Sequence, residues 1–303
     1  MADVNLEGLI RRNRRVDLVF AGAGLLVLFV TVAMLSALVI DLAIDGAPRL
    51  SWDFLTSFPS RKAARAGILS AWVGTSLVML VTAALAVPLG VAAGVYLEEY
   101  APRHWITDVI EINVTNLAGV PSIIYGLLAL GLFVHAFAMG ETILVAGMVL
   151  ALLILPVVIV ATREAIRSIP LVIREGSYAL GADQWQTVRM YMLPAARPGI
   201  LTGVIVGMSR AIGETAPVIT IGALTFIAFL PPAPVSGGFP FINFDWLLAE
   251  FTVMPIQMFN WISRPQAEFH VNAAAAGLIL LVMTLAMNGL AITIRYRARR
   301  TAR

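Results

Sequence analysis

The 303-residue sequence contains no cysteine and a single lysine, Lys62. The absence of cysteine excludes disulfides, thiolate metal sites and a cysteine nucleophile. No Gly-Lys-Ser/Thr motif is present, so the sequence has no P-loop, and any ATP hydrolysis that drives its function must take place on another subunit. The three histidines (His104, His135 and His270) are scattered, without the spacing of metal ligands. We therefore expect no catalytic residue, no metal site and no cofactor bound by this chain.

Charged residues are also scarce. Only 13% of the residues are charged, whereas 59% are hydrophobic, and the mean hydropathy is +0.88. Because a soluble domain is about one quarter charged, this composition excludes a soluble enzyme and indicates an integral membrane protein. The formal charge of +3 and the pI of about 9.6 would suggest a nucleic-acid partner for a soluble protein. Arginine-rich cytoplasmic loops explain them better here, and we expect no nucleic-acid binding.

Long hydrophobic runs dominate the chain, and runs of roughly 20 apolar residues are long enough to cross a bilayer as helices. Six are predicted: Val19–Ile40, Leu69–Leu97, Leu117–Ala138, Ile143–Ala161, Ile200–Leu230 and Val271–Ile294. The first follows the sequence RRNRR, but it is too long for a signal-peptide core and lacks a clear cleavage site, so it is interpreted as a retained span. The predicted fold is therefore an all-α membrane protein with six transmembrane helices.

The distribution of arginine predicts the orientation of these helices. Both ends of the chain and the segment between the fourth and fifth spans are rich in arginine, which places them in the cytoplasm. The loop that carries Arg49, Arg61, Lys62 and Arg65 lies outside in this topology, against the positive-inside rule. The arginines of the cytoplasmic segments are more numerous and still favour this orientation. The expected organisation has these parts: a cytoplasmic arm (1–18), a six-helix domain (19–294) with a cytoplasmic loop (163–198) and an outer loop (231–270), and a basic cytoplasmic tail (295–303).

The cytoplasmic loop contains two short helix signals. The residues from Glu175 to Leu180 predict one helix, Gly181 a turn, and Asp183 the N-cap of a second helix that runs to Leu193 and ends before Pro194. A rigid helix pair between two spans suits docking to a partner. These features alone fit an ordinary connecting loop equally well.

The same loop resembles the EAA loop of ABC importer permeases. That pattern has Glu-Ala-Ala, a later glycine, then a hydrophobic residue and Leu-Pro, and here Glu175, Gly181, Met192, Leu193 and Pro194 stand at those places. Alanine is replaced at two positions by other small residues. The resemblance implies a type I importer fold with a coupling helix that inserts into a cleft of an ATPase subunit. The coupling residues that it implies are Glu175, Gly176, Ser177, Gly181, Ala182, Leu193 and Pro194.

Three further segments resemble the phosphate permeases of this class, of the PstA type. They are GTSLVMLVTAALAVPLGVAAGVYLEEYAP, NLAGVPSIIYGL and ILTGVIVGMSRAIGETAPVI, and the resemblance extends from Gly67 to the C-terminus. It implies four kinds of partner: a second, PstC-like permease subunit, a dimer of PstB-like ATPase subunits that bind ATP and Mg, an extracytoplasmic PstS-like phosphate-binding protein, and phosphate itself. A permease for another tetrahedral oxyanion, such as molybdate or sulfate, is the nearest alternative. An anion channel or secondary transporter is a further one, although it has no use for an ATPase dock.

The fifth apolar run carries the sequence SRAIGETAP. If this helix enters the membrane near Ile200, Arg210 lies about 15 Å inside, at 1.5 Å per residue, which is about half of the hydrocarbon core. An ionised arginine there costs at least roughly 2.5–3.5 kcal/mol, so it should face protein or an aqueous cavity. Glu214, four residues on, can neutralise it on the same helix face. Pro217 predicts a break near Gly213, followed by free amide groups that could bind an anion.

Two roles are open for this pair: contact with the translocated phosphate, since a guanidinium matches phosphate oxygens, or a brace against a partner permease. Other candidates are weaker. Arg163 could line the inner mouth of the pathway, but an arginine at the membrane interface is ordinary. Ser122 and Tyr125 could donate to an oxyanion, although packing is favoured. The predicted pathway residues are Arg210, Glu214, Thr215, Ser209, Arg163, Ser122 and Tyr125.

Overall fold

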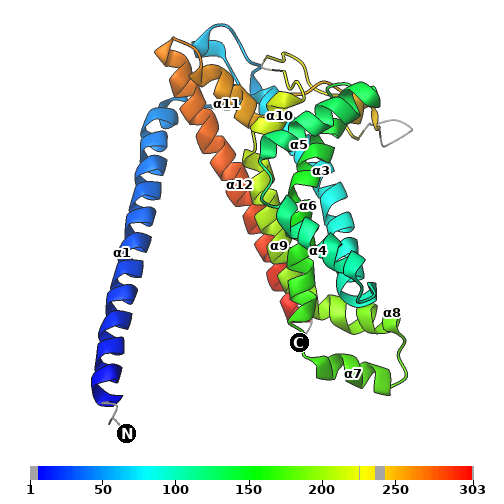
Figure 1. Cartoon of the computed structure of the whole chain (residues 1–303). Coiled ribbons are helices and arrows are strands. Elements are labelled where there is room, and N and C mark those ends of the chain that lie inside the picture. Colours follow the sequence, from blue (N-terminus) through cyan, green and yellow to red (C-terminus); the bar gives the residue numbers. More distant parts are fainter. Residues whose placement is uncertain (1–5, 225, 236–242, 302–303) are drawn as a thin grey trace.

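The computed structural model describes residues 6–224, 226–235 and 243–301, and its regular elements in these ranges are helices (Figure 1). Five of the described helices are long and apolar enough to cross a membrane, and a bent helix pair makes a sixth span when it is counted as one. The prediction of an all-α membrane protein is therefore confirmed. The long helices are α1 (Leu6–Gly46), α3 (Leu69–Val95), α6 (Ile143–Arg167), α9 (Leu193–Gly213) and α12 (Ala267–Thr301).

Helix α1 stands apart from the rest of the bundle (Figure 1). The most apolar stretch of this span has no buried residue, and only its C-terminal end packs against α12. At that end a Cβ added to Gly46 would lie 2.7 Å from the backbone nitrogen of Ala275, so the two helices approach closely there. The long apolar surface of α1 must be covered by lipid or by another protein.

Small residues hold α3, α6 and α9 together. A Cβ added to Gly90 or Gly94 of α3 would lie 2.7 Å from Val158 or 2.6 Å from Thr162 of α6. On the other side of α6, a Cβ added to Gly203 of α9 would lie 2.1 Å from Cβ of Ala161. Such contacts allow the close backbone approach that stabilises helix pairs in membranes. The three helices therefore form a tightly packed unit.

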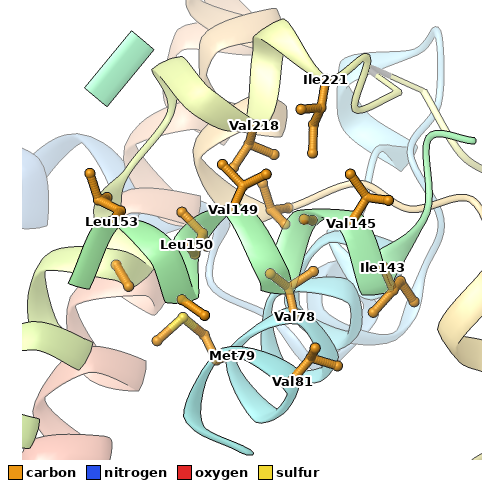
Figure 2. Close-up of a cluster of buried hydrophobic side chains, with 14 of the residues drawn as sticks. Val78, Met79, Val81, Ile143, Val145, Val149, Leu150, Leu153, Val218 and Ile221 are labelled. Carbon is orange, nitrogen blue, oxygen red and sulfur yellow. The ribbon is translucent and has the colours of Figure 1, made fainter. Parts of the chain in front are cut away.

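A buried apolar cluster fills one end of this unit (Figure 2). It joins Val78 of α3 and Val149 of α6 to Val218 of the short helix α10 (Ala216–Thr220). Buried apolar side chains thus fix α10 on the α3–α6 pair.

The third predicted span, Leu117–Ala138, differs from the structure. In its place lie α4 (Trp105–Leu117), α5 (Ser122–Ala129) and the π-helical segment η4 (Leu130–Ala136), with a bend of 105° between α4 and the helix that follows. The bend falls before Pro121, which disfavours helical geometry in the residue that precedes it. The hydroxyl of Tyr125 donates to the carbonyl of Leu117 at 2.8 Å across the break.

The fifth predicted span is also corrected. Helix α8 (Gln184–Thr187) and the π-helical segment η5 (Val188–Met192) continue directly into α9, so the second loop helix does not end before Pro194. Pro194 follows the π-helical segment directly, and such a local change of helix geometry accommodates the missing N–H inside a continuing helix. At the other end, α9 stops at Gly213 and the chain is irregular after α10, so helix does not extend to Leu230.

The connections on the opposite side of the bundle from α7 and α8 contain short helices. These are η1 (Ala47–Arg49), α2 (Trp52–Thr56), η2 (Ala63–Arg65), η6 (Asp245–Leu248) and α11 (Met254–Ile262). Part of the predicted outer loop, 236–242, lies outside the described residues. Helix α11 is buried against α3 and α12, with Met254 and Trp261 fully enclosed. One face of α11 therefore packs against the bundle, whereas Phe259 and Ile262 on its other face are exposed.

Candidate functional site

The broken helix predicted from Pro217 is present. Helix α9 ends at Gly213, Glu214 has extended geometry, and α10 begins with Pro217 in its first turn. The prediction of a break near Gly213 is confirmed, and its cause is the missing amide and the bulk of the proline ring. Helix α10 has only five residues, so its dipole at the N-terminus is weak.

Arg210 and Glu214 meet across this break. The Nε of Arg210 lies 3.3 Å from a carboxylate oxygen of Glu214. The Arg210 side chain is 39% exposed, whereas that of Glu214 is 18% exposed and borders a small cavity beside Thr75 of α3. Leu150 lines the same cavity, seven residues from the start of α6, which is about 10 Å along that helix. The pair therefore lies in the half of the bundle near α10 and α11, with Arg210 open on one side.

An inner groove, formed by two adjoining hollows between α4, α6 and α9, runs from this region towards the other end of the bundle. The first hollow, about 430 Å³, reaches Val206, one turn before Arg210 on the same face of α9. The second, about 450 Å³, is charged and includes Arg163. Both hollows are lined by Thr115 and Val160, so they lie next to each other.

Arg163 lies at the charged end of the inner groove. It pairs with Glu111 of α4, and its Nε lies 3.5 Å from Glu98, which follows α3. Its side chain is only 10% exposed, because these carboxylates enclose it. Since Arg163 stands near the end of α6 opposite Leu150, the structure does not bring it together with Arg210.

Three of the remaining predicted pathway residues, Ser209, Thr215 and Tyr125, have hydrogen-bond partners within the chain. The hydroxyl of Ser209 lies 2.7 Å from the side-chain oxygen of Asn288, which ties α9 to α12, and that of Thr215 lies 3.5 Å from the Gly213 carbonyl. Tyr125 closes the α4–α5 bend, and Ser122 is the half-buried first residue of α5. The contacts of Tyr125 and Ser209 give both a packing role, whatever else they do.

The predicted coupling loop is a well-formed helix pair. Helix α7 (Leu171–Ala179) begins four residues earlier than predicted, and Gly181 adopts a positive φ of +85° in the turn. Asp183 caps α8, as predicted, and Gln186 completes a reciprocal capping box with it. The buried hydroxyl of Ser177 bonds to Thr187, which joins the two helices.

The surface of this pair is apolar. Val172, Leu180 and Trp185 are 75%, 85% and 56% exposed. Glu175 and Gly176 are exposed on the same pair, whereas Ala182 is half-buried in the turn between the two helices. Leu193 and Pro194 are half-buried at the start of α9. An exposed apolar patch rimmed by polar residues is typical of a protein interface.

Sequence reasoning missed an acidic pair at the end of α3. Glu98 and Glu99 lie in the π-helical segment η3 (Tyr96–Tyr100), and they pair with arginines of α6 and α7. Two adjacent glutamates directly after an apolar run were a visible signal. Their partners lie 69 and 75 residues away along the chain, so no local pattern identifies them.

Comparisons with known proteins agree with this geometry. The family model described as "Binding-protein-dependent transport system inner membrane component" matches residues 86–300. The chain is 34% identical to the "Probable ABC transporter permease protein YqgI" of Bacillus subtilis, covering 83% of this chain and 86% of the relative. It is 32% identical to "Phosphate transport system permease protein PstA 1" of Mycobacterium tuberculosis, covering 78% and 72%, and 30% identical to PstA of Yersinia pestis, covering 90% and 86%.

Solved structures share the fold at low sequence identity. A chain of a bacterial alginate ABC transporter is 13% identical, with a TM-score of 0.65, over 94% of this chain and 96% of its own length. A chain of the inward-facing MetNI methionine ABC transporter is 17% identical, with a TM-score of 0.58, over 76% and 95%. The helical arrangement is therefore that of type I ABC importer permeases.

Proposed function

Because this chain belongs to the family of binding-protein-dependent transport system inner membrane components, we propose that it is a transmembrane subunit of an ATP-driven importer of inorganic phosphate. The observation that carries the proposal is the Arg210–Glu214 pair on a broken membrane helix. Broken helices form substrate sites in many transporters, and a guanidinium offers phosphate two parallel hydrogen bonds. The names of the PstA relatives support phosphate as the substrate.

The exposure of Arg210 supports a shared pathway. A charged side chain that is 39% exposed within a membrane is stable only against water or another protein. A second permease subunit facing α9 would complete a water-filled path around Arg210. Glu214 then neutralises the arginine between transport events, and phosphate competes with this carboxylate for the guanidinium.

The inner groove gives such a path a continuation. Its part beside Val206 is lined mainly by apolar side chains, and its other part contains Arg163 and Arg167. An anion that leaves Arg210 would cross the apolar part before it meets further positive charge. Glu111 and Glu98 already neutralise much of that charge, which would keep phosphate from binding too firmly. Weak, successive sites suit release better than a single strong one.

The helix pair α7–α8 supports an ATPase partner. Its exposed apolar side chains and rigid capping fit insertion into a cleft of a separate ATPase subunit, which would hold ATP and Mg. We place this pair and both chain termini in the cytoplasm, and α2 and α11 on the side that receives an extracytoplasmic binding protein.

The substrate can be tested by measuring ATP hydrolysis and anion uptake by the complete complex reconstituted in liposomes. ATP hydrolysis and uptake should be stimulated by phosphate in the presence of its binding protein, and much less by sulfate or molybdate. Stimulation by sulfate or molybdate alone would favour the alternative of another oxyanion. Uptake that is independent of ATP would favour a channel or secondary transporter.

A further inference from the structure

Glu99 is an enclosed carboxylate at the end of α3 that the transport pathway does not use. Its side chain is 2% exposed and pairs with Arg174 of α7. The side chain of Gln184, the first residue of α8, donates to the backbone carbonyl of Glu99. Both helices of the coupling loop are therefore attached to a single residue. An enclosed carboxylate without its partner is strongly destabilising, so this attachment is firm.

The neighbouring Glu98 attaches the end of α6 to the same place. Its carboxylate accepts two hydrogen bonds from Arg167, at 3.2 and 2.9 Å, in a bidentate pair. Arg163 approaches it from the buried side at 3.5 Å. Ion pairs and hydrogen bonds thus connect the C-terminal end of α3 both to the coupling loop and to α6, the helix before that loop.

The other end of α3 holds the segments that close the opposite side of the bundle. Ser70 donates to the carbonyl of Ile227 at 3.0 Å, and the hydroxyl of Thr75 accepts from the amide of Met254, the first residue of α11, at 2.9 Å. No side chain larger than that of glycine fits at position 74, because a Cβ added to Gly74 would lie 2.1 Å from the carbonyl oxygen of Thr252. The cavity beside Glu214 is lined by Thr75 and Val253 from these same segments.

Helix α3 connects these two sets of contacts directly. Its 27 residues span about 40 Å, and glycine contacts fix it along α6. We propose that α3 is the element that transmits movement of the coupling loop to the segment around α11, and that Glu99 and Arg174 are the positioning residues of this transmission. Neither residue touches substrate or nucleotide in this scheme. The inference rests on the chain's role as an ABC permease subunit and is independent of the substrate.

The test compares variants in the assembled, reconstituted transporter. Glu99→Gln removes the charge pair, and the double variant Glu99→Arg with Arg174→Glu exchanges it. Glu268→Gln is the matched control, since this carboxylate is exposed in the first turn of α12, away from the coupling loop and the inner groove. For Glu99→Gln we expect normal assembly and ATP hydrolysis within about twofold, because Arg174 is 30% exposed and water can solvate it. Transport per ATP should fall by about tenfold, a typical size for the loss of a coupling contact. The exchange should restore at least part of this ratio, and the control should keep it.

A second readout needs no substrate and therefore separates this inference from the phosphate proposal. Val253→Cys introduces a unique cysteine beside α11, in a chain that has none. Labelling with an impermeant maleimide from the α11 side should rise when ATP and vanadate trap the complex, and Glu99→Gln should abolish that rise.

Three results would overturn the proposal. One is unchanged transport per ATP and unchanged labelling in Glu99→Gln. Another is a loss of transport that the charge exchange does not restore at all. The third is failure of both Glu99→Gln and Arg174→Gln to assemble, which would assign the pair a purely structural role.

Discussion

The guanidinium of Arg210 lies 3.3 Å from the carboxylate of Glu214, across the residue at which α9 ends. Glu214 has extended backbone geometry, so its carboxylate reaches Arg210 from just beyond the end of the helix. A counter-ion that phosphate displaces and a brace against a partner permease predict different behaviour of this pair.

The first prediction concerns this pair. Arg210→Gln should lower phosphate uptake by about 10- to 100-fold, the loss expected when a charged hydrogen-bond donor is removed. Arg210→Lys should restore uptake only in part, because an ammonium group lacks the bidentate fork. Glu214→Gln should also impair uptake, by leaving Arg210 without its counter-ion. Uptake and assembly yield should be measured on the same variants.

A brace would behave differently. Either neutralisation would then lower the yield of the complex with its partner permease, and exchange of the two charges would partly restore it. Normal uptake by Arg210→Gln would remove Arg210 from the pathway.

The second prediction concerns the turn of the coupling loop. Gly181 has a φ of +85°, and an added Cβ would meet open space, so the cost of Gly181→Val is backbone strain of at least about 1–2 kcal/mol. We expect this variant to insert normally but to hydrolyse ATP without transport. Gly181→Asn should be milder, since asparagine tolerates this geometry. Gly176→Ala, whose Cβ also meets open space, is the control and should behave as wild type.

The third prediction concerns helix packing. Gly203→Val would drive a branched side chain into Ala161 of α6, and overpacking of this kind costs about 1–3 kcal/mol. The thermal stability of the purified complex should fall. The same substitution at Gly289 of α12, where an added Cβ has nothing within 4 Å, should leave stability nearly unchanged. Equal effects at both positions would contradict the role assigned to close packing.

The fourth prediction concerns topology. In sealed cells, Gln184→Cys of α8 should resist an impermeant maleimide from outside, whereas Arg61→Cys, an exposed position in the connection between α1 and α3, should react. The native chain contributes no background labelling, because it has no cysteine. Labelling of Gln184→Cys from outside would reverse the proposed orientation.

Local chemistry allowed much of the site to be predicted. Pro217 breaks α9, Asp183 caps α8 and Gly181 turns the chain because each acts on backbone groups within a few residues. Hydropathy located the spans for a similar reason, since each helix must satisfy its own backbone in lipid.

The predictions that were wrong or missing concerned features that depend on contacts between residues far apart in the sequence or on the geometry of neighbouring helices. Pro194 and Pro121 carry the same chemical restriction, yet one lies inside a continuing helix and the other follows a sharp bend. The π-helical segment before Pro194 makes the difference, and composition does not reveal it. The partners of Glu98 and Glu99 were missed because the fold, not the sequence order, brings their arginines to them.

The separation between Glu99 and its partners has a consequence for biosynthesis. Arg174 and Gln184 emerge from the ribosome 75 and 85 residues after Glu99. At about 5–20 residues per second, this carboxylate waits several seconds in water before it can be enclosed. The ion pair cannot close until the fourth span has been inserted and the loop after it has been made. Its closure therefore requires that about the first three fifths of the 303-residue chain have been made.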